Sequence, residues 1–168
     1  MSAAARTRVR AFVALGANIG EPVTCLRAAA AELAALPDTT IVARSSLYRS
    51  APVGLINQPD FINAVVAVDT ALAPLGLLHR LLDIEARHGR VRSVPNAPRP
   101  LDLDLLLHGD SRMDSPELTL PHPRMHQRAF VLLPLLEIAP DASIPGLGAA
   151  RDFVPAVAGQ AIERSEPL

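Results

Sequence analysis

The sequence contains no lysine, and all sixteen basic residues are arginine. This absence excludes a Walker A loop, whose lysine contacts nucleotide phosphates, and any chemistry that needs a Schiff-base lysine. The abundance of Ala, Pro and Leu points to genomic base composition as the ordinary cause, but the chemical consequence is the same. If the protein handles phosphate, it must use arginine side chains, bound metal and backbone amides.

Tryptophan is also absent, and Phe and Tyr together number only five. Few aromatic rings and a net charge of -1 argue against nucleic-acid binding. The single cysteine, Cys25, cannot form an intramolecular disulfide, which is typical of a reducing compartment. The apolar runs are too short to span a bilayer or to form a signal peptide, so we expect a cytoplasmic protein that does not contact membranes.

The 168 residues suffice for one domain, and we expect residues 1–168 to form it, with 1–8 and about 159–168 flexible. Apolar patterns predict strands over 9–15, 40–48, 61–70 and 101–109, and helices over 22–36, 74–88 and 125–138, the last broken at Pro134. This order predicts an α+β fold with a ferredoxin-like βαββαβ core. In it, two helices cover one face of a mainly antiparallel sheet, and further elements follow at the C-terminus.

Two carboxylates interrupt a leucine-rich strand in the segment Arg99-Pro100-Leu101-Asp102-Leu103-Asp104-Leu105-Leu106-Leu107. Because side chains alternate along a strand, Asp102 and Asp104 share one face, with Cα atoms ~6.6 Å apart. Such a pair can hold one or two divalent cations. The alternative is an edge strand with a solvated acidic face.

Three arginines, Arg90, Arg92 and Arg99, stand in the proline-rich connection before this strand. Arginines beside a metal site suit a polyphosphate, although they could equally balance nearby acidic residues in a solvated loop. Glu85 falls on the apolar stripe of the preceding helix, where a carboxylate needs a partner.

Two further patterns are weaker taken alone. His122, between two prolines, is either an exposed turn residue, a ligand of a weakly indicated zinc site with His126, or a phosphate contact, which is the better functional interpretation. Phe61 and Asn63 share a strand face, where a ring and an amide suit a flat nitrogen heterocycle. Their structural alternative is a core phenylalanine and a strand-end asparagine.

These residues together resemble the 6-hydroxymethyl-7,8-dihydropterin pyrophosphokinase family of folate biosynthesis. The resemblance extends from Ala14 to Pro140. Its most specific motifs are Gln58-Pro59-Asp60-Phe61-Ile62-Asn63-Ala64, Ile84-Glu85 with Gly89-Arg90-Val91-Arg92, Ala97-Pro98-Arg99-Pro100-Leu101-Asp102-Leu103-Asp104, and Leu120-Pro121-His122-Pro123-Arg124 with Arg128-Ala129-Phe130-Val131-Leu132.

The resemblance implies transfer of the β,γ-pyrophosphoryl group of ATP to the pterin hydroxymethyl group. Asp102 and Asp104 would bind two Mg²⁺ ions and act in catalysis with Arg90 and Arg92. The residues implied at ATP are Leu78, Glu85, Arg90, Arg92, Arg99, Leu105, Leu118, Thr119, His122 and Arg128. Those implied at the reduced pterin are Ser50, Ala51, Val53, Gly54, Phe61, Asn63 and Phe130.

We expect a monomer whose ligands are ATP and the pterin. Two other hypotheses remain open: a binding or regulatory module that holds a nucleotide without chemistry, and a different metal-dependent phosphotransferase or hydrolase that uses the same carboxylates.

Overall fold

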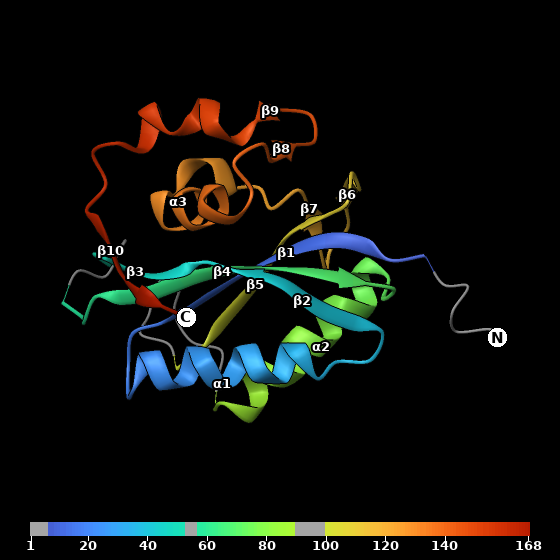
Figure 1. Ribbon diagram of the computed structural model, residues 1–168, viewed down its shortest axis with the longest axis horizontal. Coiled ribbons are helices and arrows are strands. Elements are labelled where there is room, and N and C mark those ends of the chain that lie inside the picture. Colours follow the sequence, from blue (N-terminus) through green and yellow to red (C-terminus); the bar gives the residue numbers. More distant parts are fainter. Residues whose placement is uncertain (1–6, 53–56, 90–99) are drawn as a thin grey trace.

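The computed structural model describes residues 7–52, 57–89 and 100–168, and in these ranges it contains a six-stranded sheet with helices on both faces (Figure 1). The strands of this sheet are β1 (Val9–Ala17), β2 (Thr39–Arg44), β3 (Ser46–Ser50), β4 (Phe61–Thr70), β5 (Asp102–His108) and β10 (Ile162–Pro167). The helices are α1 (Pro22–Ala34), α2 (Pro74–Arg87) and α3 (Ala129–Ile138). Short strand pairs join β6 (Met113–Asp114) to β7 (Thr119–Leu120) and β8 (Ser143–Ile144) to β9 (Gly148–Ala149).

The sheet has the strand order β10-β3-β4-β1-β5, with β2 also paired to β4, and every pairing is antiparallel. The single strand expected over 40–48 is in fact two strands, which pair with different parts of β4. They part at Ser45, whose hydroxyl accepts the Val65 N–H at 2.9 Å while its own N–H bonds to the Val65 carbonyl. When β2 and β3 are counted as one broken strand, the order is that of a ferredoxin-like sheet, as predicted.

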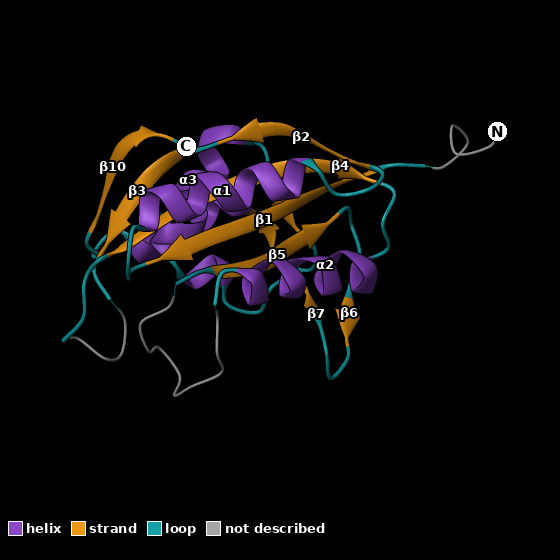
Figure 2. Ribbon diagram, turned by 90° about the horizontal axis from the view of Figure 1, so that it is seen from below, coloured by secondary structure: helices purple, strands orange, loops and turns teal. Residues whose placement is uncertain are grey.

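Alternation along the strands creates two cores. Val13 and Leu15 of β1 face one side of the sheet, where they pack with α1 and α2. Phe12 and Ala14 face the other side, against the buried residues of α3. Figure 1 shows α1 and α2 on one face and α3 on the opposite face, and Figure 2 shows α2 beside β5. The two helices of the predicted core thus lie on one face, as expected, and α3, which corresponds to the helix predicted over 125–138, covers the other face.

Helix α3 continues through Pro134, where we expected a break. A proline inside a helix removes one backbone hydrogen bond and crowds the preceding turn. Here Val131, Leu132 and Leu135 are all buried on the sheet side, and this packing outweighs the local cost. A separate short 3₁₀ turn, Met125–Gln127, precedes the helix.

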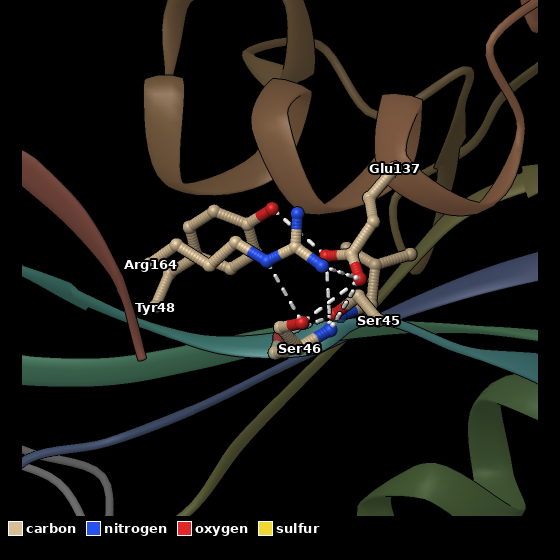
Figure 3. Close-up of polar contacts among 6 residues, drawn as sticks. Ser45, Ser46, Tyr48, Glu137 and Arg164 are labelled. Atoms are coloured by element: carbon tan, nitrogen blue, oxygen red, sulfur yellow. Dashed lines mark hydrogen bonds and ion pairs between the residues drawn. The ribbon is translucent and has the colours of Figure 1, made fainter. Parts of the chain in front are cut away.

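The expectation of a flexible end over 159–168 does not match the structure, because β10 pairs with β3. Figure 3 shows the polar cluster that fixes this strand. Glu137 of α3 accepts hydrogen bonds from the Ser46 N–H, the Tyr48 hydroxyl at 2.8 Å and the Arg164 guanidinium at 3.1 Å. The cluster thus joins α3, β3 and β10. None of the helices in the described residues is long and apolar enough to cross a membrane.

Candidate active site

A cavity of about 790 Å³ opens where β1 ends and where β4 and β5 begin, between α2 and the start of α3. It draws its lining from both halves of the chain. The lining residues are Ala14, Leu15, Gly16, Ser50, Ala51, Phe61, Asn63, Leu78, Leu82, Glu85, Ala86, Asp102, Leu103, Asp104, His122, Pro123, Arg124, Arg128 and Phe130.

Asp102 and Asp104 both line this cavity, on the face of β5 predicted from their spacing. Leu101 just before the strand and Leu103 within it are buried in the core beneath α1 and α2. The strand is also at an edge of the sheet, as the structural alternative required. However, its two carboxylates face a cavity rather than open solvent.

Glu85, the carboxylate expected to need a partner, has one in β5. The buried Glu85 side chain accepts the Leu103 backbone N–H at 2.6 Å. Leu103 lies between the two aspartates, so this bond ties α2 to the strand at the point where both carboxylates project.

The amide of Asn63 is held at another part of the wall. Its Nδ2 atom donates to the Ser50 hydroxyl at 2.7 Å, which connects β4 to the end of β3. Gly16 of β1 lies against this amide, and a Cβ atom there would be 3.2 Å from Asn63 Oδ1. A side chain at position 16 would therefore compete with the amide for space.

The segment that leads into β4 is fixed by Asn18, which is almost completely buried. Its amide donates to Gln58 Oε1 at 2.7 Å and to the Pro59 carbonyl at 3.0 Å. These bonds position the chain immediately before Phe61, whose ring lines the cavity.

Arg128 and Phe130 enter the cavity from the start of α3. The Arg128 guanidinium lies over the Phe130 ring, with 5.4 Å between Cζ and the ring centroid. This cation–π contact orients the arginine while leaving positive charge at the cavity wall.

His122 is neutral at physiological pH. Burial, followed by the positive charge of Arg128, lowers its pKa to about 4, although Asp102 opposes the shift. Its Nδ1 atom accepts the Arg124 backbone N–H at 3.2 Å, as an unprotonated ring nitrogen does. A neutral imidazole here can donate or accept a hydrogen bond but adds no positive charge.

The structure brings together most of the predicted site residues that it describes. Those that line the cavity are Ser50, Ala51, Phe61, Asn63, Leu78, Glu85, Asp102, Asp104, His122, Arg128 and Phe130. The predicted residues Val53, Gly54, Arg90, Arg92 and Arg99 lie outside the described residues.

Three predicted nucleotide contacts are not in the cavity wall: Leu105, Leu118 and Thr119. Leu105 and Leu118 are buried in the core beneath the helices. Leu105 lies on the same face of β5 as Leu103, opposite the aspartates. Thr119 instead pairs with Asp114 in the β6–β7 ribbon.

Eight lining residues were not among the predicted site residues: Ala14, Leu15, Gly16, Leu82, Ala86, Leu103, Pro123 and Arg124. Arg124 stands in the motif that contains His122, so its charge was a usable signal. The position of Gly16 depends on Asn63, which is distant in sequence, and no local pattern indicates that contact.

The donor set at Asp102 and Asp104 fits magnesium. In the part of the chain that the structure describes, no group of three or more His, Cys, Asp or Glu side chains could hold a metal ion. Magnesium does not require such a group, because it is commonly bound by one or two carboxylates together with phosphate oxygens and water. Two carboxylates on one face suit an ion that arrives with a phosphorylated ligand.

Paired carboxylates, guanidinium groups and aromatic rings around one cavity suit an enzyme that transfers a phosphoryl-type group to a ring-shaped acceptor. The comparison with known families agrees. The model of the 7,8-dihydro-6-hydroxymethylpterin-pyrophosphokinase (HPPK) family matches residues 12–140. The chain belongs to this family, and the pyrophosphokinase interpretation of the sequence is confirmed.

Curated relatives carry the corresponding enzyme name, 2-amino-4-hydroxy-6-hydroxymethyldihydropteridine pyrophosphokinase. The protein from Pseudomonas aeruginosa is 46% identical over 155 residues, which is 92% of this chain and 96% of that protein. The protein from Haemophilus influenzae is 45% identical over 82% of this chain and 86% of its own length.

Solved structures share the fold at low identity. Wild-type HPPK-DHPS of Plasmodium falciparum, crystallised with pteroate, matches with a TM-score of 0.71 and 15% identity. The match covers 89% of this chain and 44% of the Plasmodium chain, so the chain spans less than half of that longer protein. The ferredoxin-like architecture predicted from the element order is confirmed.

Proposed function

We propose that the protein transfers the β,γ-pyrophosphoryl group of ATP to the hydroxymethyl oxygen of 6-hydroxymethyl-7,8-dihydropterin, with release of AMP. The observation that carries this proposal is the placement of Asp102 and Asp104 on one wall of a cavity that also contains Phe61, Asn63 and Phe130. Polar groups that suit a metal–polyphosphate complex and groups that suit a flat heterocycle thus share one space.

Asp102 and Asp104 are proposed to hold two Mg²⁺ ions. When bound with ATP, these ions would neutralise charge on the phosphate oxygens as the transfer proceeds. The carboxylates of Asp102 and Asp104 also repel each other, which favours the binding of cations between them. Either carboxylate could accept the proton of the attacking hydroxyl group.

At the nucleotide end, we assign Leu78, Glu85, His122 and Arg128 to ATP. Arg128 places a positive charge in the same cavity as the two carboxylates, and neutral His122 can hydrogen-bond a phosphate oxygen. On sequence grounds, Arg90, Arg92 and Arg99 contact the phosphates as well.

At the acceptor end, we assign Phe61, Asn63 and Phe130 to the pterin, with Ser50 and Ala51 beside them. The two rings would stack on the faces of the heterocycle, and the Asn63 amide would hydrogen-bond its edge. Val53 and Gly54 join this group on sequence grounds. Positioning of the hydroxyl group for in-line attack is the main contribution that such walls make to phosphoryl-type transfer.

The chain is proposed to act as a single-domain monomer in the cytoplasm, without a nucleic-acid partner. Support comes from the near-zero net charge and the lone cysteine, which is unpaired in the structure. Analytical ultracentrifugation at micromolar concentration tests whether the protein is a monomer. We expect a single sedimenting species near 17.8 kDa.

Asp102→Asn tests the assignment of the carboxylate wall. The variant keeps the side-chain volume but removes a charge, so AMP formation should fall by at least about a hundredfold while the thermal transition is retained. Asp110→Asn is the matched control, because Asp110 is an exposed residue in the turn that follows β5. Turnover of Asp102→Asn similar to that of the control would contradict the metal assignment.

A further inference from the structure

The C-terminal segment holds the start of α3 through one side chain, Gln160. Its Oε1 atom accepts the Ala129 backbone N–H at 2.9 Å, and its Nε2 atom donates to the Gln127 carbonyl at 2.9 Å. Both groups of one carboxamide are therefore bonded to the backbone on either side of Arg128. Two bonds from one planar group fix orientation as well as distance.

The bonded peptide groups flank the residues that enter the cavity. Ala129 is the first residue of α3 and stands between Arg128 and Phe130. The N-cap residue Arg128 makes no side-chain capping bond, although the first N–H groups of a helix lack partners within it. Gln160 supplies such a partner from 31 residues away.

The next residue, Ala161, holds the opposite wall. Its carbonyl accepts the Ala51 N–H at 3.3 Å, and Ile162 then pairs with Ser50 as β10 begins. A smaller cavity of about 170 Å³ lies between these two walls, with Gln160, Ala161 and Phe130 in its lining. Consecutive residues of the C-terminal segment thus brace both sides of the acceptor end of the main cavity.

This segment is itself anchored further along. Arg164 of β10 bonds to Glu137 in the last turn of α3 and to the Ser46 hydroxyl of β3 (Figure 3). Gln160 therefore lies just before a strand, β10, that is bonded to the last turn of α3 and to β3. The residues of the C-terminal segment that make these contacts, Gln160, Ala161 and Arg164, lie beyond residue 140, where the match to the family model ends.

We propose that Gln160 is a positioning residue for the acceptor: it fixes the Arg128–Ala129–Phe130 backbone so that the Phe130 ring is preorganised to stack on the pterin. The inference rests on the proposed function only for the identity of the ligand. Preorganised walls bind more tightly because less freedom is lost on binding. Loss of the carboxamide should consequently weaken pterin binding more than ATP binding.

The test compares Gln160→Ala and Gln160→Glu with the control Glu163→Ala, which removes an exposed side chain from β10 of the same segment. Calorimetric titrations measure Kd for the reduced pterin and, separately, for ATP with magnesium, and the same samples give KM and kcat. Gln160→Ala should raise Kd and KM for the pterin about tenfold and those for ATP less than about twofold. Gln160→Glu keeps an acceptor for the Ala129 N–H and should recover part of the loss.

Hydrogen exchange of the Ala129 amide gives a second readout that does not depend on activity. It should be faster in Gln160→Ala than in Glu163→Ala, because the amide has lost its acceptor. The positioning role would be overturned if Gln160→Ala raised Kd for the pterin and for ATP equally. It would also be overturned if the variant had a lower Tm but unchanged Kd and KM for both ligands. Failure of the wild type to bind pterin or form AMP would instead defeat the proposed function, and unchanged Ala129 exchange would then defeat the Gln160 inference separately.

Discussion

The Glu85 carboxylate accepts a hydrogen bond from the Leu103 backbone N–H at 2.6 Å. This contact joins helix α2 to edge strand β5 midway between Asp102 and Asp104. A backbone N–H at a sheet edge has no strand partner on its outer side, and the buried carboxylate provides one. Glu85 thereby helps to fix the positions of both aspartates, and it also lines the cavity.

Removal of this acceptor should reduce both stability and turnover. Glu85→Ala leaves the Leu103 N–H without its partner and should lower the free energy of unfolding by about 1–3 kcal/mol. It should also lower kcat, because the strand that carries both aspartates is held less firmly. Glu85→Gln keeps an acceptor oxygen and should retain more of both quantities, as measured by denaturant unfolding and steady-state kinetics. A larger loss of stability and of kcat in Glu85→Gln than in Glu85→Ala would contradict the anchoring role.

Gly16→Ala should affect the acceptor end of the cavity. The added Cβ atom would be 3.2 Å from Asn63 Oδ1, so the amide must move away from its present position. We expect a higher KM for the pterin, by several-fold, with little change in KM for ATP.

Gly76→Ala is the matched control for this substitution. Gly76 lies inside α2, and an added Cβ atom there meets nothing within 4 Å. This change should leave both KM values unaltered and stabilise the helix by about 0.5–1 kcal/mol. If the two variants had identical kinetics, the contact between Gly16 and Asn63 would be irrelevant to binding.

Glu137 should make stability depend on acid pH. Burial acts to raise its pKa, but bonds from Ser46 and Tyr48 and the charge of Arg164 outweigh burial, and the pKa lies below its ordinary value of 4.5. The folded state therefore binds this proton less readily than the unfolded state does. The resulting stabilisation is present above pH 4.5 and is lost as the pH falls through the lowered pKa.

Glu137→Gln should consequently lower the free energy of unfolding by about 1–3 kcal/mol at pH 7. The difference from wild type should shrink as the pH is lowered below 4.5, the ordinary pKa of the carboxyl group. Denaturant titrations between pH 7 and pH 3 measure this difference in the free energy of unfolding. Glu163→Gln, an exposed change in β10, is the control and should remain within about 0.5 kcal/mol of wild type. A difference for Glu137→Gln that did not vary with pH would contradict the ionic role of this carboxylate.

Tyr48→Phe tests the same cluster from the alkaline side. Burial and the bond to Glu137 raise the pKa of Tyr48 to about 12. Retention of the phenolic proton stabilises the folded state below pH 10, the ordinary pKa, and this contribution is lost as the pH rises through 12. The phenylalanine variant should therefore be less stable than wild type at neutral pH and should lose less stability under alkaline conditions, as followed by circular dichroism.

Local sequence patterns were sufficient to predict the strands and helices in which apolar side chains recur at a regular spacing. The strand predicted over 61–70 is β4, Phe61–Thr70, because a run of Val, Ile and Ala follows Pro59 and faces helices on both sides. The shared face of Asp102 and Asp104 also follows from alternation alone. The assignment of Leu105 to the nucleotide came from the family resemblance alone and stays a prediction.

Other features depend on contacts between residues that are far apart in sequence. The division of the expected strand over 40–48 requires the bonds between Ser45 and Val65. The C-terminal strand has a polar, exposed sequence that does not predict a strand, and it forms because β3 offers an edge and Glu137 binds Arg164. The bracing role of Gln160 likewise has no local signal.

The most direct test of pyrophosphoryl transfer by this protein is the identity of the nucleotide product. Wild-type protein is mixed with ATP, magnesium and 6-hydroxymethyl-7,8-dihydropterin, and the products are separated by ion-exchange chromatography. We expect AMP and the pterin diphosphate in equal amounts, with no AMP when the pterin is omitted. Formation of ADP or free phosphate in place of AMP would contradict pyrophosphoryl transfer.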